Sequence, residues 1–171
     1  KITIKESQVK RGGFIDEARL DKKIADQMRV CWYKMGEGKL NGFQNQFLTS
    51  NIACLICSEI TFDKSLTENG FKVTHFRDFL LSTNLPDNAD LKYSDYFFTG
   101  YSAATGGNDQ NNAPVYYLNK TNEWSDEFTT SEKLYVVFFV ASKNYLKETL
   151  KLGIDSENSS AVMLVNEYAL N

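Results

Sequence analysis

Residues 24–40, IADQMRVCWYKMGEGKL, and residues 51–63, NIACLICSEITFD, decide the fold of this 171-residue chain. They hold all three cysteines and the most regular apolar patterns in the sequence. The first segment continues a helical pattern that starts at Leu20, whereas the second alternates as a strand does. We therefore expect a long helix, a polar connection over residues 39–51, and then a strand.

The expected helix covers residues 20–35, because apolar side chains recur there every three or four positions. These side chains are Leu20, Ile24, Met28, Cys31, Trp32 and Met35. Gly36 and Gly38 follow, and glycine adopts at low cost the left-handed conformation that ends helices. The pattern predicts five or so turns with one buried face, and Cys31 lies on that face.

The expected strand covers residues 52–62, where one set of alternate positions is almost entirely apolar. The other set starts apolar and becomes polar at Glu59 and Thr61. This pattern predicts a strand that is apolar on both faces at its start and amphipathic later.

The three cysteines leave several pairings open. On a strand, side chains three positions apart point to opposite faces, so Cys54 and Cys57 do not easily bridge. We expect a structural disulfide between Cys31 and one of these two strand cysteines. Three buried free thiols are the alternative, and redox or metal chemistry is a weaker one. A zinc site would need His75 as its fourth ligand, and the spacing matches no common zinc module.

The two segments together form a pattern, CWxxxGEGK from Cys31 to Lys39 and CxxCxxIxFD from Cys54 to Asp63. This core resembles a group of uncharacterised extracytoplasmic domains in membrane-anchored proteins of small-genome (DPANN-type) archaea. The resemblance covers residues 1–63 and carries no known activity or catalytic residue. It implies a cell-surface location, with an N-terminal membrane anchor and a further cysteine upstream of this chain.

Composition narrows the range of partners. The formal charge is −3, from 19 basic and 22 acidic residues, so there is no electrostatic footprint for nucleic acid or an acidic membrane surface. No apolar run reaches the roughly 18 residues that a bilayer crossing requires. A length of 171 residues suits one domain, residues 1–171, with a real core.

The rest of the sequence alternates between strand and helix patterns without a regular repeat. We expect strands at residues 1–5, 114–118, 132–141 and 161–170, helices at 73–84, 90–101 and 143–152, and a loop at 102–113. The run EKLYVVFFVA at 132–141 is apolar from Leu134 onward, which indicates a central strand buried on both faces. Thr74 is the expected N-cap of the helix at 73–84. The predicted fold is α+β, a mixed, mainly antiparallel sheet with one long N-terminal helix on a face and two or three shorter helices.

No complete catalytic set is evident, and we expect no cofactor and no bound metal. The chain lacks a GxSxG elbow and has a single histidine, His75, which we interpret as a surface or capping residue. Two-carboxylate hydrolysis needs only acids, so an envelope hydrolase using Glu37 with Glu59 or Asp63 is the alternative function. It requires the two carboxylates to share a cleft within about 10 Å.

The favoured function is a non-enzymatic extracytoplasmic domain that acts in envelope organisation or protein–protein contact. The expected partner is another protein at the cell surface, not nucleic acid, and any membrane contact runs through the upstream anchor. Aromatic residues at helical spacing, Tyr93, Tyr96 and Tyr101, are the predicted partner surface.

Overall fold

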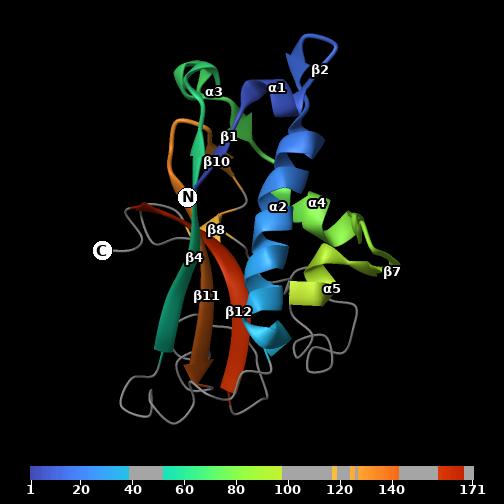
Figure 1. Cartoon of the computed structure of the whole chain (residues 1–171), viewed down its shortest axis with the longest axis vertical. Coiled ribbons are helices and arrows are strands. Elements are labelled where there is room, and N and C mark those ends of the chain that lie inside the picture. Colours follow the sequence, from blue (N-terminus) through green and yellow to red (C-terminus); the bar gives the residue numbers. More distant parts are fainter. Residues whose placement is uncertain (39–51, 98–116, 119–123, 126, 143–157, 168–171) are drawn as a thin grey trace.

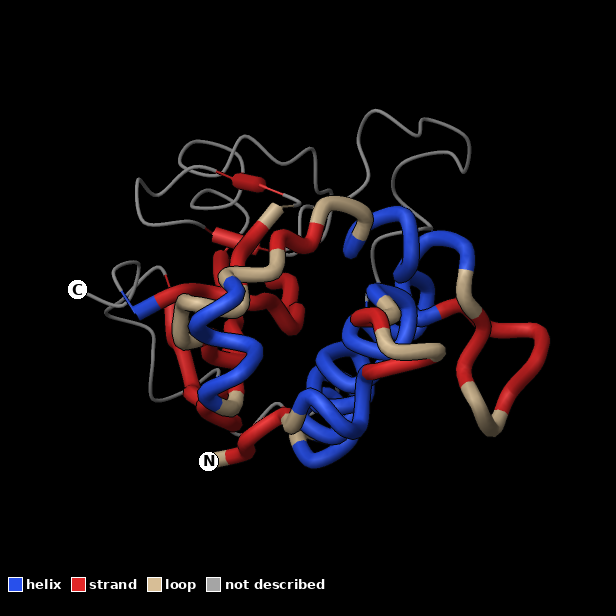
Figure 2. Tube along the Cα trace, turned by 90° about the horizontal axis from the view of Figure 1, so that it is seen from above, coloured by secondary structure: helices blue, strands red, loops and turns tan. Residues whose placement is uncertain are grey.

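The computed structural model describes residues 1–38, 52–97, 117–118, 124–125, 127–142 and 158–167. It confirms the α+β class. A sheet of mostly antiparallel strands lies on one side of a long central helix, α2 (Glu17–Lys34), and the short helices α4 (Phe76–Ser82) and α5 (Tyr93–Phe97) lie on the other side (Figure 1). Figure 2 shows the same arrangement from above, with most of the strands on one side of the central helix.

Helix α2 is longer than predicted at its N-terminus. Asp16 caps it by accepting a hydrogen bond from the Arg19 backbone N–H at 3.3 Å, as short polar N-cap residues do. Gly36 follows in the left-handed region at φ 64°, where the helix gives way to the short 3₁₀ turn η1 (Gly36–Gly38). The expected apolar face is buried, except that Met35 is only partly covered. Helix periodicity therefore located this element correctly.

The main sheet has the strand order β1-β4-β11-β12-β8-β9. Its strands are β1 (Ile2–Ile4), β4 (Ile52–Phe62), β8 (Tyr117–Leu118), β9 (Trp124–Ser125), β11 (Leu134–Ser142) and β12 (Asn158–Asn166). β11 is the central strand that the sequence predicted, with antiparallel β4 and β12 on its two sides and buried residues on both faces. β1 pairs in parallel with the end of β4, and β8 pairs in parallel with β12.

A β-bulge in β4 sets the position of the strand cysteines. Ser58 lies opposite Val136 and Ile56 lies opposite Val137, so Cys57 is the extra residue. Cys57 points toward α2 and forms a disulfide with Cys31, with the two Cα atoms 5.6 Å apart. The predicted link between the helix and a strand cysteine is confirmed. It joins the C-terminal part of α2 to the sheet.

The other side of α2 is covered by the segment that follows β4. This segment contains α4 (Phe76–Ser82), the hairpin of β6 (Asn84–Leu85) and β7 (Asn88–Lys92), and α5 (Tyr93–Phe97). Phe79 of α4 and Phe97 of α5 both pack against the buried Tyr93 ring in tilted orientations, at centroid distances of 5.9 and 6.0 Å. α2 therefore lies between the sheet and this segment (Figure 1).

Two helix predictions were wrong in extent. The helix expected at 73–84 begins only at Phe76, and Thr74 does not cap it. The Glu17 carboxylate caps it instead, by accepting hydrogen bonds from the backbone N–H groups of Thr74 and His75 at 2.8 and 3.1 Å. The helix expected at 90–101 begins at Tyr93, because residues 88–92 pair with β6 in the hairpin.

Several short elements have no periodic signal and were not predicted. They are α1 (Glu6–Val9), β2 (Lys10–Arg11), β3 (Phe14–Ile15), α3 (Lys64–Asn69), β5 (Lys72–Val73) and β10 (Phe128–Thr129). The predicted helix at 143–152 and loop at 102–113 lie outside the described residues. Within those residues, no helix has the length and apolar character needed to span a membrane.

Candidate functional site

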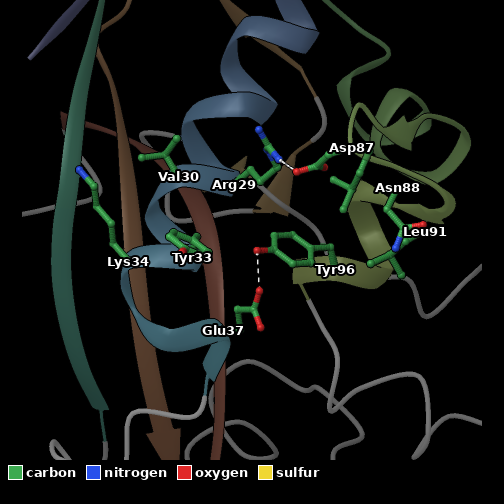
Figure 3. A pocket seen from close by; sticks show the side chains of 10 residues that line it. Arg29, Val30, Tyr33, Lys34, Glu37, Asp87, Asn88, Leu91 and Tyr96 are labelled. Carbon is green, nitrogen blue, oxygen red and sulfur yellow. Dashed lines mark hydrogen bonds and ion pairs between the residues drawn. The ribbon is translucent and has the colours of Figure 1, made fainter.

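A pocket of about 740 Å³ opens between the C-terminal half of α2, η1 and the β7–α5 segment (Figure 3). Its lining residues are Arg29, Val30, Tyr33, Lys34, Glu37, Leu85, Asp87, Asn88, Leu91 and Tyr96. Pockets of about 300–1,000 Å³ that combine apolar walls with a few polar groups are the usual shape of a ligand site. Helix α2 supplies one wall because its exposed face passes opposite the hairpin and α5.

Glu37 and Tyr96 meet across the pocket. The Tyr96 hydroxyl donates a hydrogen bond to Glu37 Oε1 at 2.9 Å, from α5 to η1 (Figure 3). Burial, this hydrogen bond and the Glu37 charge raise the pKa of Tyr96 to about 12. Glu37 is the one non-glycine residue with a positive φ among those described, at 54°, which aims its side chain toward α5. The pair fixes the floor of the pocket.

Arg29 and Asp87 form an ion pair at the rim. Arg29 Nη1 lies 2.6 Å from Asp87 Oδ2, and the Asp87 side chain is 68% exposed. The pair ties α2 to the turn between β6 and β7 (Figure 3). An ion pair this open to solvent adds little to stability, because water screens it.

Two apolar side chains of α2 remain uncovered beside these polar groups. Tyr33 is 71% exposed and Val30 is 41% exposed, and both line the pocket. Leu85 and Leu91 from the hairpin form the opposite apolar wall. A buried aromatic needs no ligand, but an exposed tyrosine at a pocket mouth is a typical binding contact.

The residues predicted to form the partner surface do not lie together on one exposed surface. Tyr96 lines the pocket, whereas Tyr93 is fully buried and donates a hydrogen bond from its hydroxyl to Asp26 Oδ1 at 2.6 Å. Tyr93 is therefore a core residue, and assigning it to an exposed surface was wrong. Helical spacing placed both tyrosines on one short helix but could not tell which would face the core. Tyr101 lies outside the described residues.

The three predicted acids lie in three separate places. Glu59 points away from α2 and forms an ion pair with Lys1 at 3.1 Å. Asp63 caps α3 and accepts a hydrogen bond from the Glu6 backbone N–H at 2.8 Å. α1 adjoins the N-terminus of α2, so Asp63 and Glu37 are separated by roughly the 27 Å length of that helix. Glu37 therefore shares its pocket with neither acid.

The remaining predicted residues are also accounted for. Cys54 is a free, exposed thiol on the face of β4 turned away from Cys57. Partial desolvation raises the pKa of the Cys54 thiol, which is the opposite of what an activated thiolate requires. His75 is exposed at the start of α4, where its Nδ1 lies 3.7 Å from Asp78 Oδ2. No group of three metal-ligating side chains occurs within the described part of the chain.

Sequence reasoning missed Arg29, Tyr33 and Asp87. Arg29 and Tyr33 both lie outside the buried face of α2, and nothing in the helix pattern shows what faces them. Asp87 follows Pro86 in a PDN sequence, a turn signal that places it at a hairpin tip. The pocket arises only because this hairpin folds back onto α2.

Comparison of the chain with protein-family models, with curated proteins and with solved structures gives no match. The archaeal resemblance therefore stays a prediction, and the candidate site rests on its own geometry.

Proposed function

We propose that this chain is a non-enzymatic extracytoplasmic domain that binds a segment of a partner protein in the pocket beside α2. The observation that carries the proposal is the exposed Tyr33 at the mouth of a pocket with mixed apolar and polar walls. Exposed aromatic side chains next to a concave surface are enriched where proteins bind partners.

The polar contacts inside the pocket favour binding over chemistry. Tyr96 donates to Glu37, and Arg29 pairs with Asp87, so each acid already has a structural partner. A general base needs a pKa near the working pH and reach to a reacting proton. The raised pKa of Tyr96, about 12, keeps that hydroxyl protonated near neutral pH, where it acts as a hydrogen-bond donor.

The disulfide supports the extracytoplasmic location in this proposal. A Cys31–Cys57 bond is compatible with an oxidising, extracytoplasmic location, since disulfides are rare in reducing compartments. Placement at the cell surface through an upstream anchor is part of the same proposal, and the archaeal resemblance is its support.

Selection of peptides from a random displayed library against the full chain tests the proposal. We expect enriched peptides to bind a Tyr33→Ala variant at least tenfold more weakly than the unmodified protein. Tyr33 is 71% exposed, so its truncation leaves the core intact.

Phe14→Ala is the matched control. Phe14 is also an exposed aromatic, at 81%, but it lies in the β2–β3 hairpin near the N-terminal end of α2. Binding by the Phe14→Ala variant should be unchanged. Enrichment of no peptide, or equal binding to the Tyr33→Ala variant, would contradict the proposed function.

A further inference from the structure

We infer that the segment bound in this pocket is an acidic peptide, whose carboxylate contacts Lys34 while its apolar side chains contact the pocket walls. The inference rests on the proposed function and names the chemistry of the ligand. It follows from which hydrogen-bonding groups of the pocket are already in use and which are not.

Three acceptor atoms of the pocket already accept hydrogen bonds within the protein. Glu37 Oε1 accepts from the Tyr96 hydroxyl, and Asp87 Oδ2 accepts from Arg29 Nη1. Asn88 Oδ1 accepts from the backbone N–H of Asp90 at 3.1 Å. Each of these three groups therefore already has a hydrogen-bond partner within the protein.

Several hydrogen-bond donors of the pocket, by contrast, have no partner. Among the described residues, the Lys34 ammonium, the Tyr33 hydroxyl and the side-chain amide N–H groups of Asn88 have no hydrogen-bond or ion-pair partner. Arg29 Nε is buried and also lacks a partner. Unused donors around a pocket call for a ligand that carries acceptors, and an anion makes the strongest such bonds.

The charges around the pocket favour the α2 side as the anion site. Glu37 and Asp87 lie toward α5, and both raise the pKa of Tyr96, so an anion placed there would meet like charge. Lys34 leaves α2 on the side of β4, away from both acids (Figure 3). A carboxylate therefore fits at the Lys34 rim.

The apolar walls of the pocket indicate that the ligand also carries apolar side chains. Val30 and Tyr33 come from α2, as Lys34 does, whereas Leu85 and Leu91 come from the β6–β7 hairpin. An inorganic anion would leave these surfaces in water, whereas an acidic peptide with leucine-like side chains covers them.

Three acetylated tetrapeptides with the same apolar residues test the inference by NMR titration of the full chain. The first has an internal glutamate and an amidated end, the second has glutamine and a free carboxyl end, and the third has glutamine and an amidated end. We expect both carboxylate peptides to bind at least tenfold more tightly than the neutral one, with the largest shifts at Tyr33 and Lys34. The tighter of the two identifies the carboxylate as a side chain or a chain end.

Lys34→Gln should remove this preference, so that all three peptides bind as the neutral one does. Lys23→Gln, an exposed lysine of α2 far from the pocket, should retain it. Equal binding of all three peptides to the unmodified protein would overturn the inference and leave the proposed function standing. Binding of none of them, while library-selected peptides still bind, would also overturn it, because the ligand would then lack this chemistry.

Discussion

Asp21 is a carboxylate in a buried environment that disfavours its charged form. It lies on the buried side of α2, 2% exposed, and its Oδ1 has no hydrogen-bond partner. Burial raises its pKa from 3.8 to about 8, with a further contribution from the nearby Glu17 charge. The folded protein therefore holds a neutral Asp21 below about pH 8, since an unpaired buried carboxylate is costly.

The first prediction concerns the pH dependence of stability. The folded state binds one more proton at Asp21 than the unfolded state does between pH 3.8 and about pH 8, so this residue makes the free energy of unfolding fall as pH rises through that window. The expected loss is on the order of 5 kcal/mol across the window. Asp21→Asn, which mimics the neutral form, should flatten the curve and exceed the unmodified protein in stability above pH 8.

Urea unfolding at a series of pH values measures this effect. Asp95→Asn, at an exposed aspartate of α5, is the control and should keep the slope of the unmodified protein. A slope that survives in the Asp21→Asn variant would mean that another group carries it.

At the level of elements, the junction of α2 with α4 depends on one carboxylate. Glu17 in the first turn of α2 accepts from the two backbone N–H groups at the start of α4, at 2.8 and 3.1 Å. The first N–H groups of a helix have no partner within it, so an acceptor from another element satisfies them. This contact positions the whole segment that forms the far wall of the pocket.

We predict that Glu17→Ala lowers the free energy of unfolding by about 1–3 kcal/mol, because it leaves two backbone donors without their acceptor. Glu17→Gln keeps an acceptor oxygen and should lose less than about 1 kcal/mol. Both are best measured by urea unfolding at pH 5.5, where Asp21 is neutral and its coupling to Glu17 does not contribute. Equal losses in the two variants would assign the effect to charge instead of hydrogen bonding.

At the scale of the molecule, the disulfide is the one covalent link between the helix and the sheet. It joins residues 26 apart in sequence, around a loop that includes residues 39–51. A crosslink stabilises a fold mainly by reducing the entropy of the unfolded chain, and this loop length corresponds to about 3.5 kcal/mol.

The third prediction is that the double variant Cys31→Ala/Cys57→Ala loses about that amount of stability in urea unfolding. Cys54→Ala, at the exposed free thiol, should change stability by less than about 1 kcal/mol. Alkylation of the unmodified protein should label one cysteine before reduction and three after it. Labelling of all three without reduction would show that the bond is absent.

The sequence was sufficient for the elements with strong periodicity. The apolar repeat of α2 and the alternation in β4 gave nearly correct bounds, and the unbroken apolar run of β11 identified the central strand. These signals are reliable because a long helix or a buried strand must repeat the same burial pattern over many residues. The short elements between residues 64 and 97 have too few residues to show a period, so their bounds were missed or shifted.

Of the residues in the candidate site, the sequence predicted only Glu37 and Tyr96. It predicted each of them for a separate reason and did not predict that they contact each other. Glu37 stood out between two glycines, and Tyr96 stood out in an aromatic run. Their meeting, and the ion pair of Arg29 with Asp87, join residues 58 or 59 positions apart. A local pattern carries no information about such pairs.

The sequence by itself determined the α+β class and the central helix and strands, because each follows from burial patterns within a single element. It favoured a helix-to-strand disulfide and left free thiols as the alternative. Only the tertiary structure decided that Cys57 is the bonded strand cysteine, that Tyr93 is core while Tyr96 lines a pocket, and that Glu37 is separated from Glu59 and Asp63. Those outcomes depend on the bulge in β4 and on how the hairpin folds back onto α2. They are properties of packing between elements distant in sequence, which no single element encodes.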